Sequence, residues 1–291
     1  MKHRLEAFAY DVVTGLMRLF PFAAVSAFGG FVVRCIGPIT SKKHIAETGL
    51  RTAFPEKSNA EIKSLMRAQW ENLGRTFAEF SLTHRLRPFE KNSRVKVIGM
   101  EHFNAHHPAI LISGHFANWE IMATVLTQSD HTVRVTYRKI NNPHIDNRIR
   151  KQREAYGTKF LVKKTGHASG RELFEALKSG DSVALLNDQK FNTGVEVPFF
   201  GEPAMTAQGA VRLALKTKRP LLPMAVKRDK SHFIVSFYPP IILQDTGERD
   251  ADVLAGVRQI TGFIEDRVRE NPAQWFWVHR RWPKALYRRP K

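Results

Sequence analysis

Short apolar segments alternate with longer stretches of helical periodicity from residue 94 to the end of the chain. Apolar side chains recur every three to four positions most clearly at 206–217 and 251–269, which predicts amphipathic helices there. Strands that alternate with helices predict an α/β domain, a mixed sheet flanked by helices on both faces. The apolar segments that we expect to form its strands are 95–98, 109–113, 133–137, 182–186, 221–226 and 233–237.

The preceding residues lack this alternation and are predicted to be helical. Ser58 and Glu61 have the spacing of a capping box, and the apolar positions after them predict a helix over 59–83. Neither an internal repeat nor a low-complexity linker divides the chain. We therefore expect an N-terminal membrane-associated segment (1–40), a helical region (41–93) and the α/β domain (94–291).

The membrane assignment comes from residues 19–33, which carry no charged side chain and lie between Arg18 and Arg34. The segment is short for a membrane span, which needs about 20 apolar residues. Glu6 and Asp11 interrupt the approach that a signal peptide would have. We expect a retained segment that lies in the membrane plane or spans it as a short helix. A pair of buried core helices is the alternative.

Charge narrows the range of partners. The chain has 46 Lys and Arg against 27 Asp and Glu, a formal net charge of +19. Nucleic acid, an anionic membrane and a phosphorylated substrate are the polyanions that this excess favours. We expect no nucleic-acid partner, because zinc-finger spacing, an aromatic RNA-binding strand and zipper heptads are all missing. The single cysteine, Cys35, excludes an intramolecular disulfide and a cysteine-rich metal site.

The segment 109–120, AILISGHFANWE, suggests chemistry where an apolar strand opens into a helix. His115 and Glu120 would diverge by about 140° on one helix, so they can meet only if His115 lies on the turn. Glu120 could then fix the tautomer of His115, the general base. The alternative is that His115 only caps the helix or fills a turn and has no catalytic role. The two-histidine zinc motif is absent, and we expect no metal.

Five blocks in order make the sequence recognisable. It resembles the late acyltransferases of lipid A biosynthesis, lauroyl and myristoyl transferases of the lysophospholipid-acyltransferase-like superfamily. Their His-x4-acid motif corresponds to His115 and Glu120. The further matching blocks are Tyr137-Arg138 with Asn141-Asn142-Pro143, 170–181, Asn187-Asp188-Gln189 with 197–206, and Trp275 to Trp282.

The resemblance implies transfer of an acyl chain from an acyl-carrier-protein thioester to a hydroxyl of a Kdo-lipid IVA type precursor, without a cofactor. His115 and Glu120 would be catalytic. Arg138 is the first candidate for a substrate phosphate, because a guanidinium binds phosphate bidentately, and Arg171 is the next. Asp188 could orient Arg138, and the backbone near Asn118 could stabilise an oxyanion. We expect these four residues, Arg138, Asp188, Asn118 and Arg171, to bind substrate.

Further expectations concern the cleft and the partners. Residues 197–201 could form a cleft wall or belong to the ordinary core, and Thr206 could cap the next helix. Residues 275–282 suit either a headgroup interface or an aromatic core. Eleven Lys and Arg against two acids at 134–171 suggest a landing site for phosphates and acyl carrier protein. We expect the protein at the cytoplasmic face of an inner membrane. A glycerolipid or ornithine-lipid O-acyltransferase with the same His-x4-acid pair is the rival function.

Overall fold

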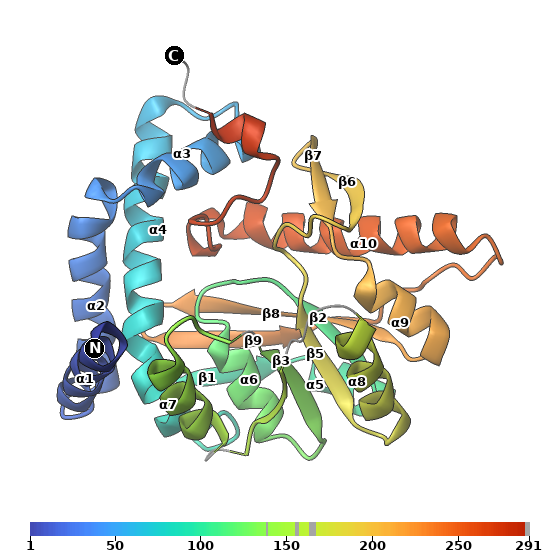
Figure 1. The fold of residues 1–291 in the computed structure, drawn as a ribbon, viewed down its shortest axis with the longest axis horizontal. Helices are drawn as coiled ribbons and strands as arrows, with labels where there is room; N and C mark the ends of the chain where they lie inside the picture. Colours follow the sequence, from blue (N-terminus) through green and yellow to red (C-terminus); the bar gives the residue numbers. More distant parts are fainter. Residues whose placement is uncertain (138, 155–156, 163–166, 289–291) are drawn as a thin grey trace.

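The computed structural model describes residues 1–137, 139–154, 157–162 and 167–288. Within these residues seven strands form the main sheet, in the order β1-β9-β8-β2-β5-β3-β4 (Figure 1). Five neighbouring strands, from β8 to β4, run parallel, whereas β9 is antiparallel to β8. The predicted mixed sheet is thus confirmed. Its strands are β1 (Val95–Ile98), β2 (Ile110–Ser113), β3 (Val133–Tyr137), β4 (Lys159–Val162), β5 (Ser182–Leu186), β8 (Leu221–Asp229) and β9 (His232–Phe237).

All six predicted strands are present, but three others were missed. β4 is a four-residue edge strand, and the hairpin of β6 (Val195–Phe199) and β7 (Glu202–Thr206) stands apart from the main sheet. Pro198 lies within β6, and a proline argues against a strand except at an edge. Isolated two-stranded and edge elements bury too little surface to leave a clear hydrophobic pattern.

Helices cover both faces of the sheet because its crossovers run in opposite directions. The chain passes from β2 over β5 to β3, and later from β5 back over β2 to β8. Right-handed crossovers therefore place α6 and α9 on opposite faces. The helices of this part of the chain are α5 (Met100–His106), α6 (Glu120–Thr127), α7 (Pro143–Glu154), α8 (His167–Lys178), α9 (Gly209–Thr217) and α10 (Arg249–Glu270).

The helix predicted over 206–217 begins later than expected. β7 extends to Thr206, and α9 starts at Gly209. The Thr206 hydroxyl donates to the carbonyl of Ala204, and the N-cap of α9 is Gln208. The expectation that Thr206 caps this helix is therefore wrong, because its side chain is used inside the hairpin.

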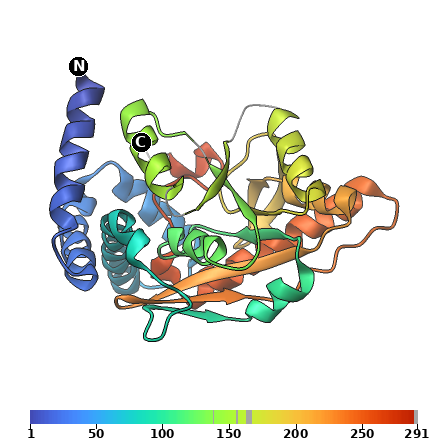
Figure 2. The ribbon, with the colours of Figure 1, turned by 90° about the horizontal axis from the view of Figure 1, so that it is seen from below.

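Four helices precede the sheet. They are α1 (Lys2–Met17), α2 (Phe22–Ile36), α3 (Lys42–Ala53) and α4 (Asn59–Glu79), and a 3-10 turn, Phe80–Arg85, continues α4. The capping box of Ser58 and Glu61 is confirmed at the start of α4. Figures 1 and 2 show α1 at the outer edge of the molecule, and Figure 1 shows α2 alongside α4.

Among the described residues one stretch, Phe22–Ile39, is long and apolar enough to cross a membrane by length and composition alone. One third of it is buried inside the protein. Its inner face packs on α4, while large apolar side chains of α1, of α2 and of the turn between them face outward. Those exposed side chains are Leu5, Phe8, Val12, Val13, Leu16, Leu19, Phe20, Phe28, Phe31 and Ile36.

Glycines allow α2 and α4 to approach closely, which generates a first prediction. A Cβ atom added at Gly74 would lie 2.2 Å from the carbonyl oxygen of Gly29 and 2.7 Å from Cβ of Val33. Gly74→Ala should therefore lower the free energy of unfolding by about 1–3 kcal/mol, the usual cost of overpacking. Urea unfolding followed by circular dichroism measures this.

Gly262→Ala in α10 is the matched control, since nothing lies within 4 Å of its added Cβ. It should be neutral, or stabilising by about 1 kcal/mol through helix propensity. Equal stability of the Gly74→Ala variant and the wild type would show that the two helices do not depend on this contact.

Candidate active site

Two neighbouring parallel strands place a histidine opposite an aspartate. β2 and β5 pair in a register that sets Ser113 opposite Leu186, and His115 and Asp188 each follow two residues later. Their side chains therefore meet at the carboxyl edge of the sheet. His115 Nδ1 lies 2.7 Å from Asp188 Oδ1, and the backbone N–H of His115 donates to Oδ2 at 2.7 Å.

Asp188 is buried and accepts a third hydrogen bond, from Nε1 of Trp275 at 2.8 Å. Burial on its own raises the pKa of Asp188. The neighbouring charge of His115 and the hydrogen bonds from His115 outweigh burial and hold that pKa well below its usual range. An ionised carboxylate only accepts hydrogen bonds, so Nδ1 carries the imidazole proton and Nε2 is the basic nitrogen.

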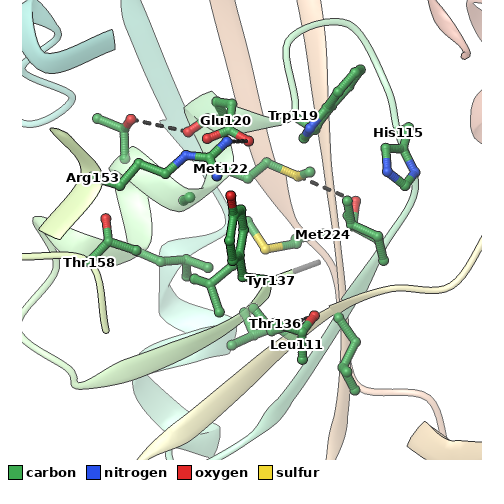
Figure 3. A pocket seen from close by; sticks show the side chains of 18 of the residues that line it. Leu111, His115, Trp119, Glu120, Met122, Thr136, Tyr137, Arg153, Thr158 and Met224 are labelled. Atoms are coloured by element: carbon green, nitrogen blue, oxygen red, sulfur yellow. Dashed lines mark hydrogen bonds and ion pairs between the residues drawn. The ribbon is translucent and has the colours of Figure 1, made fainter. Parts of the chain in front are cut away.

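Glu120 has a different partner from the one expected. Its carboxylate Oε1 lies 2.5 Å from a guanidinium nitrogen of Arg153, on α7. The expectation that Glu120 folds back onto His115 is wrong, because Asp188 occupies the Nδ1 side and Trp119 packs against the imidazole at a ring distance of 4.9 Å. Figure 3 shows Glu120 turned toward Arg153, with His115 on the far side of Trp119.

His115 and the Glu120–Arg153 pair line one cavity, with a volume of about 390 Å³ (Figure 3). Its walls come from β2, β3 and β5 and from α6. Polar and apolar side chains share its lining. Besides His115, Glu120, Arg153 and Tyr137, the polar ones are Thr83, Ser113, Thr124, Thr136, Thr158 and Gln189. The apolar ones are Phe80, Leu111, Trp119, Met122, Ala123, Leu126, Val135, Ile140, Ala184, Leu185, Leu186 and Met224.

Tyr137 adds a neutral phenol to the cavity. Its hydroxyl donates to Asp146 Oδ1 at 2.5 Å, and burial together with that carboxylate raises the pKa of Tyr137 far above its ordinary value. Arg153 packs over the Tyr137 ring at 5.5 Å. The phenol therefore stays protonated and helps to fix Arg153 beside the cavity.

The other predicted substrate ligands are spread out. Asn118 is fully buried and hydrogen-bonds to Glu79, so its side chain does not face a substrate. Asp188, expected to orient Arg138, instead holds His115. Arg171 is exposed on α8 and does not line the cavity. Arg138 lies outside the described residues.

The two aromatic blocks, 197–201 and 275–282, pack in the hydrophobic core. Phe199 is buried against Trp275 and Trp282, so residues 197–201 do not form the expected cleft wall. Arg281 is buried as well and donates to Thr206 Oγ1 at 2.6 Å. Burial lowers the pKa of Arg281 to about 10. The aromatic-core alternative for 275–282 is thus the one that the contacts favour.

Comparison with known proteins agrees with the motif blocks. Residues 1–284 match the family model of the bacterial lipid A biosynthesis acyltransferases. The chain belongs to this family. It is therefore an acyltransferase of glycolipid biosynthesis.

Relatives of this acyltransferase act on more than one kind of glycolipid, according to their names. A phosphatidylinositol mannoside acyltransferase of Mycobacterium tuberculosis (strain CDC 1551 / Oshkosh) is 28% identical over 94% of this chain and 87% of its own. The lipid A biosynthesis lauroyltransferase of Escherichia coli (strain K12) is 27% identical over 81% of this chain and 78% of its own.

Sequence reasoning about this acyltransferase missed the His115–Asp188 pair, although a signal was present. Both residues follow predicted strands by the same offset, and equal offsets in adjacent parallel strands lie side by side. Arg153 left no such signal, because it is one of many basic residues. Among the described residues no group of three or more His, Cys, Asp or Glu side chains could hold a metal ion.

The depressed pKa of Asp188 predicts how stability responds to acid. The ordinary pKa is 3.8, and the folded-state pKa lies below it. The stability contributed by the charge of Asp188 is therefore present above about pH 4 and is lost as the pH falls through the folded-state pKa. Asp188→Asn lacks this group, so its free energy of unfolding should decrease less than that of the wild type as the pH falls below about 4.

Urea unfolding at a series of pH values tests this. Glu196→Gln, a change of an exposed carboxylate on β6, is the control and should keep the wild-type slope. Parallel slopes for wild type and Asp188→Asn would contradict the assignment of a low pKa to Asp188.

Proposed function

We propose that this acyltransferase moves a fatty acyl chain from an acyl-carrier-protein thioester to a hydroxyl of a phosphorylated lipid A precursor of the Kdo-lipid IVA type. The observation that carries the proposal is the His115–Asp188 pair at a cavity whose walls include many apolar side chains. An imidazole with a buried carboxylate at Nδ1 is suited to remove a proton at Nε2. The apolar lining suits an acyl chain.

His115 Nε2 would take the proton of the acceptor hydroxyl as its oxygen attacks the thioester carbonyl. Asp188 stabilises the imidazolium that forms. As the tetrahedral intermediate collapses, the carbon–sulfur bond breaks, and the imidazolium returns its proton to the thiolate. The products are the new ester and the free thiol of the carrier. No residue of the enzyme needs to be acylated.

Backbone groups beside His115 can serve the oxyanion of that intermediate. The N–H groups of His115 and Ala117 are used, by Asp188 and by the carbonyl of Gln274. The backbone N–H of Trp119, a residue that lines the cavity, by contrast has no hydrogen-bond partner among the described residues. It precedes α6, where the helix dipole favours negative charge. We assign it to the oxyanion.

Arg153 is the one lysine or arginine among the described residues that line the cavity. Glu120 holds it at the cavity wall, so we propose that Glu120 acts through Arg153 on an anionic group of the acceptor. Arg138 follows the cavity residue Tyr137 directly in sequence and stays a proposed phosphate ligand. Arg171 is a more distant candidate, and the basic stretch 134–171 would receive the acidic acyl carrier protein.

A second acceptor is favoured by one observation. The phosphatidylinositol mannoside acyltransferase of M. tuberculosis aligns over 94% of this chain. Both acceptors are phosphorylated glycolipids that combine acyl chains with a free hydroxyl, which lies on a 3-hydroxyacyl chain in the lipid A precursor, and the same catalytic groups could serve either one. A mannosylated phosphoinositide is therefore the alternative substrate, and the assay below separates the two.

Purified protein should be incubated with acyl-carrier-protein thioesters of several chain lengths and with each acceptor, and the products read by mass. His115→Ala should reduce kcat by about 10²–10⁴-fold, as expected for a lost general base. Asp188→Asn should lose about 100-fold or more because an amide does not enforce the tautomer. Glu120→Gln should raise KM for the acceptor and lose less kcat than His115→Ala.

Arg280→Gln, an exposed change in the terminal block, is the control and should keep wild-type kcat. If only the mannosylated phosphoinositide is acylated, the substrate is the second acceptor and the lipid A precursor is excluded. Wild-type kcat in a folded His115→Ala variant would contradict the role of His115 with either acceptor.

We propose that the protein docks on the cytoplasmic face of an inner membrane through the outer apolar face of α1 and α2. In this arrangement residues 1–40 form the membrane-associated segment, 41–93 a helical region and 94–291 the acyltransferase domain. Phe28 and Phe31 project from α2, exposed by 62% and 55%. The face of α2 opposite to them is packed on α4, which favours an in-plane position over a free span.

Phe28→Ser with Phe31→Ser should weaken partition into anionic vesicles by about tenfold or more, since each buried Phe contributes about 1.5–3 kcal/mol. Phe89→Ser is the control, because Phe89 is exposed by 51% in a loop before β1. Vesicle sedimentation at high salt measures the partition. Unchanged binding of the double variant would place the attachment elsewhere.

A further inference from the structure

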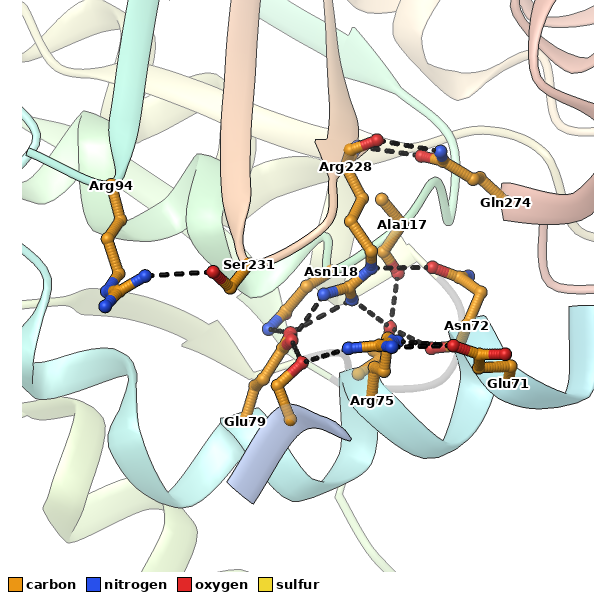
Figure 4. Close-up of polar contacts among 12 residues, drawn as sticks. Glu71, Asn72, Arg75, Glu79, Arg94, Ala117, Asn118, Arg228, Ser231 and Gln274 are labelled. Atoms are coloured by element: carbon orange, nitrogen blue, oxygen red, sulfur yellow. Dashed lines mark hydrogen bonds and ion pairs between the residues drawn. The ribbon is translucent and has the colours of Figure 1, made fainter. Parts of the chain in front are cut away.

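A buried ion pair lies behind the loop that carries His115, away from the cavity. Glu79, the last residue of α4, is fully buried, and Arg228 of β8 is 7% exposed. The guanidinium binds both carboxylate oxygens, through Nη1 to Oε1 and through Nη2 to Oε2 at 3.0 Å. Arg228 also donates to Asn72 and Thr76 of α4, and Figure 4 shows Arg228 reaching toward Asn72 and Glu79.

This pair contacts the loop of residues 114–119, here called the catalytic loop. Nδ2 of Asn118 donates to Glu79 Oε2 at 2.9 Å, and the Thr76 hydroxyl lies 2.8 Å from the carbonyl oxygen of Ala117, to which it can donate. Figure 4 shows Asn118 and Ala117 turned toward α4. The loop is thus attached to α4 at two successive residues.

A third attachment closes the network. The backbone N–H of Ala117 donates to the carbonyl of Gln274 at 2.6 Å. The side chain of Gln274 in turn bonds to both backbone groups of Arg228, at 2.8 and 3.0 Å. Arg228 therefore supports the loop directly through Glu79 and indirectly through Gln274.

The catalytic loop needs support because its backbone is strained. Ala117 has φ of +42°, a region that residues with a Cβ atom rarely adopt. Such a conformation persists only where surrounding contacts over-determine it. His115 lies two residues before Ala117, and Glu120 three residues after it. Asn118 Oδ1 also accepts the backbone N–H of Glu120 at 3.2 Å.

We propose that Glu79, Arg228 and Thr76 are positioning residues for acyl transfer. They hold the catalytic loop so that His115 meets Asp188 and Glu120 meets Arg153. None of the three lines the cavity, so they act without touching the substrate. The inference rests on the proposed role of His115 as the base.

The test removes single contacts to the loop. Removing Glu79 or Arg228 would leave the other charge buried without its partner, which is strongly destabilising. Asn118→Ala and Thr76→Val instead cut the loop from the ion pair and leave both charges in place. Thr76→Ser keeps the hydroxyl and is the rescue variant.

Two matched controls come from the same environment. The Ser26 hydroxyl of α2 donates to Glu79 Oε1 at 2.6 Å, so Ser26→Ala removes a bond to the same carboxylate without touching the loop. Thr261→Val removes the hydroxyl of another buried helical threonine, which donates to Val257 O within α10. These two variants report on stability alone.

We expect Asn118→Ala and Thr76→Val to lower kcat by about 10- to 100-fold, because small misplacements of a catalytic group cost about 100-fold. KM for the donor should stay unchanged, whereas KM for the acceptor should rise, because Glu120 and Arg153 lose their fixed position as they do in Glu120→Gln. Thr76→Ser, Ser26→Ala and Thr261→Val should remain within about twofold of wild-type kcat. A kcat loss in the controls equal to that in the loop variants, or no loss in either, overturns the proposal.

A second readout needs no substrate. Nitrogen NMR of histidine-labelled protein, with the His115 signal assigned from His115→Ala, reports the tautomer of His115. The wild type and the controls should show protonated Nδ1, and the two loop variants a mixture of tautomers. An unchanged His115 signal in both loop variants overturns the positioning role. If neither acceptor is turned over, the proposed function fails, but this spectrum still decides the inference.

Discussion

Asp188 is an ionised carboxylate removed from water, and the architecture around it follows from the need to satisfy its oxygens. Burial of an unpaired charge costs several kcal/mol even after relaxation, so such a group persists only with donors on every side. Its three donors come from the end of β2 and from Trp275. The C-terminal segment that contains Trp275 must therefore return to the edge of the sheet where Asp188 lies. The packing of Trp275 on Trp277 and Phe199 fixes the Trp275 indole that donates to Asp188.

The catalytic loop lies between this carboxylate and a second buried charge. Asp188 binds the loop at His115, and Glu79 binds it at Asn118, only three residues later. Two fixed carboxylates on opposite sides leave the loop little freedom, which explains how the strained backbone at Ala117 is maintained. Preorganisation of this kind is what acid–base and oxyanion catalysis require, since both depend on donors that do not rearrange during reaction.

The sequence allowed prediction of those features that depend on local pattern. Six strands and the main helices were visible because apolar periodicity and the capping box of Ser58 act over a few residues. The partner of His115 lies 73 positions away, and its identity depends on the order of strands in the sheet. Arg153 and Arg228 look like surface charges, because only distant carboxylates make their burial favourable. The motif at 114–120 thus lies at the candidate site, but the contacts within that site could not be predicted from it.

One helix, α4, connects the surface proposed to face the membrane with the chemistry. Gly29 and Gly74 bring α2 against the second half of α4, and the outer side chains of α2 stay exposed. Four residues beyond that contact Ala78 packs on α2, and the next residue, Glu79, binds both Ser26 and Asn118. The same carboxylate therefore joins α2 to the catalytic loop. Since a close-packed helix moves as a unit, α2 docked on a membrane as proposed would set the height of His115 relative to the surface from which a glycolipid presents its hydroxyl.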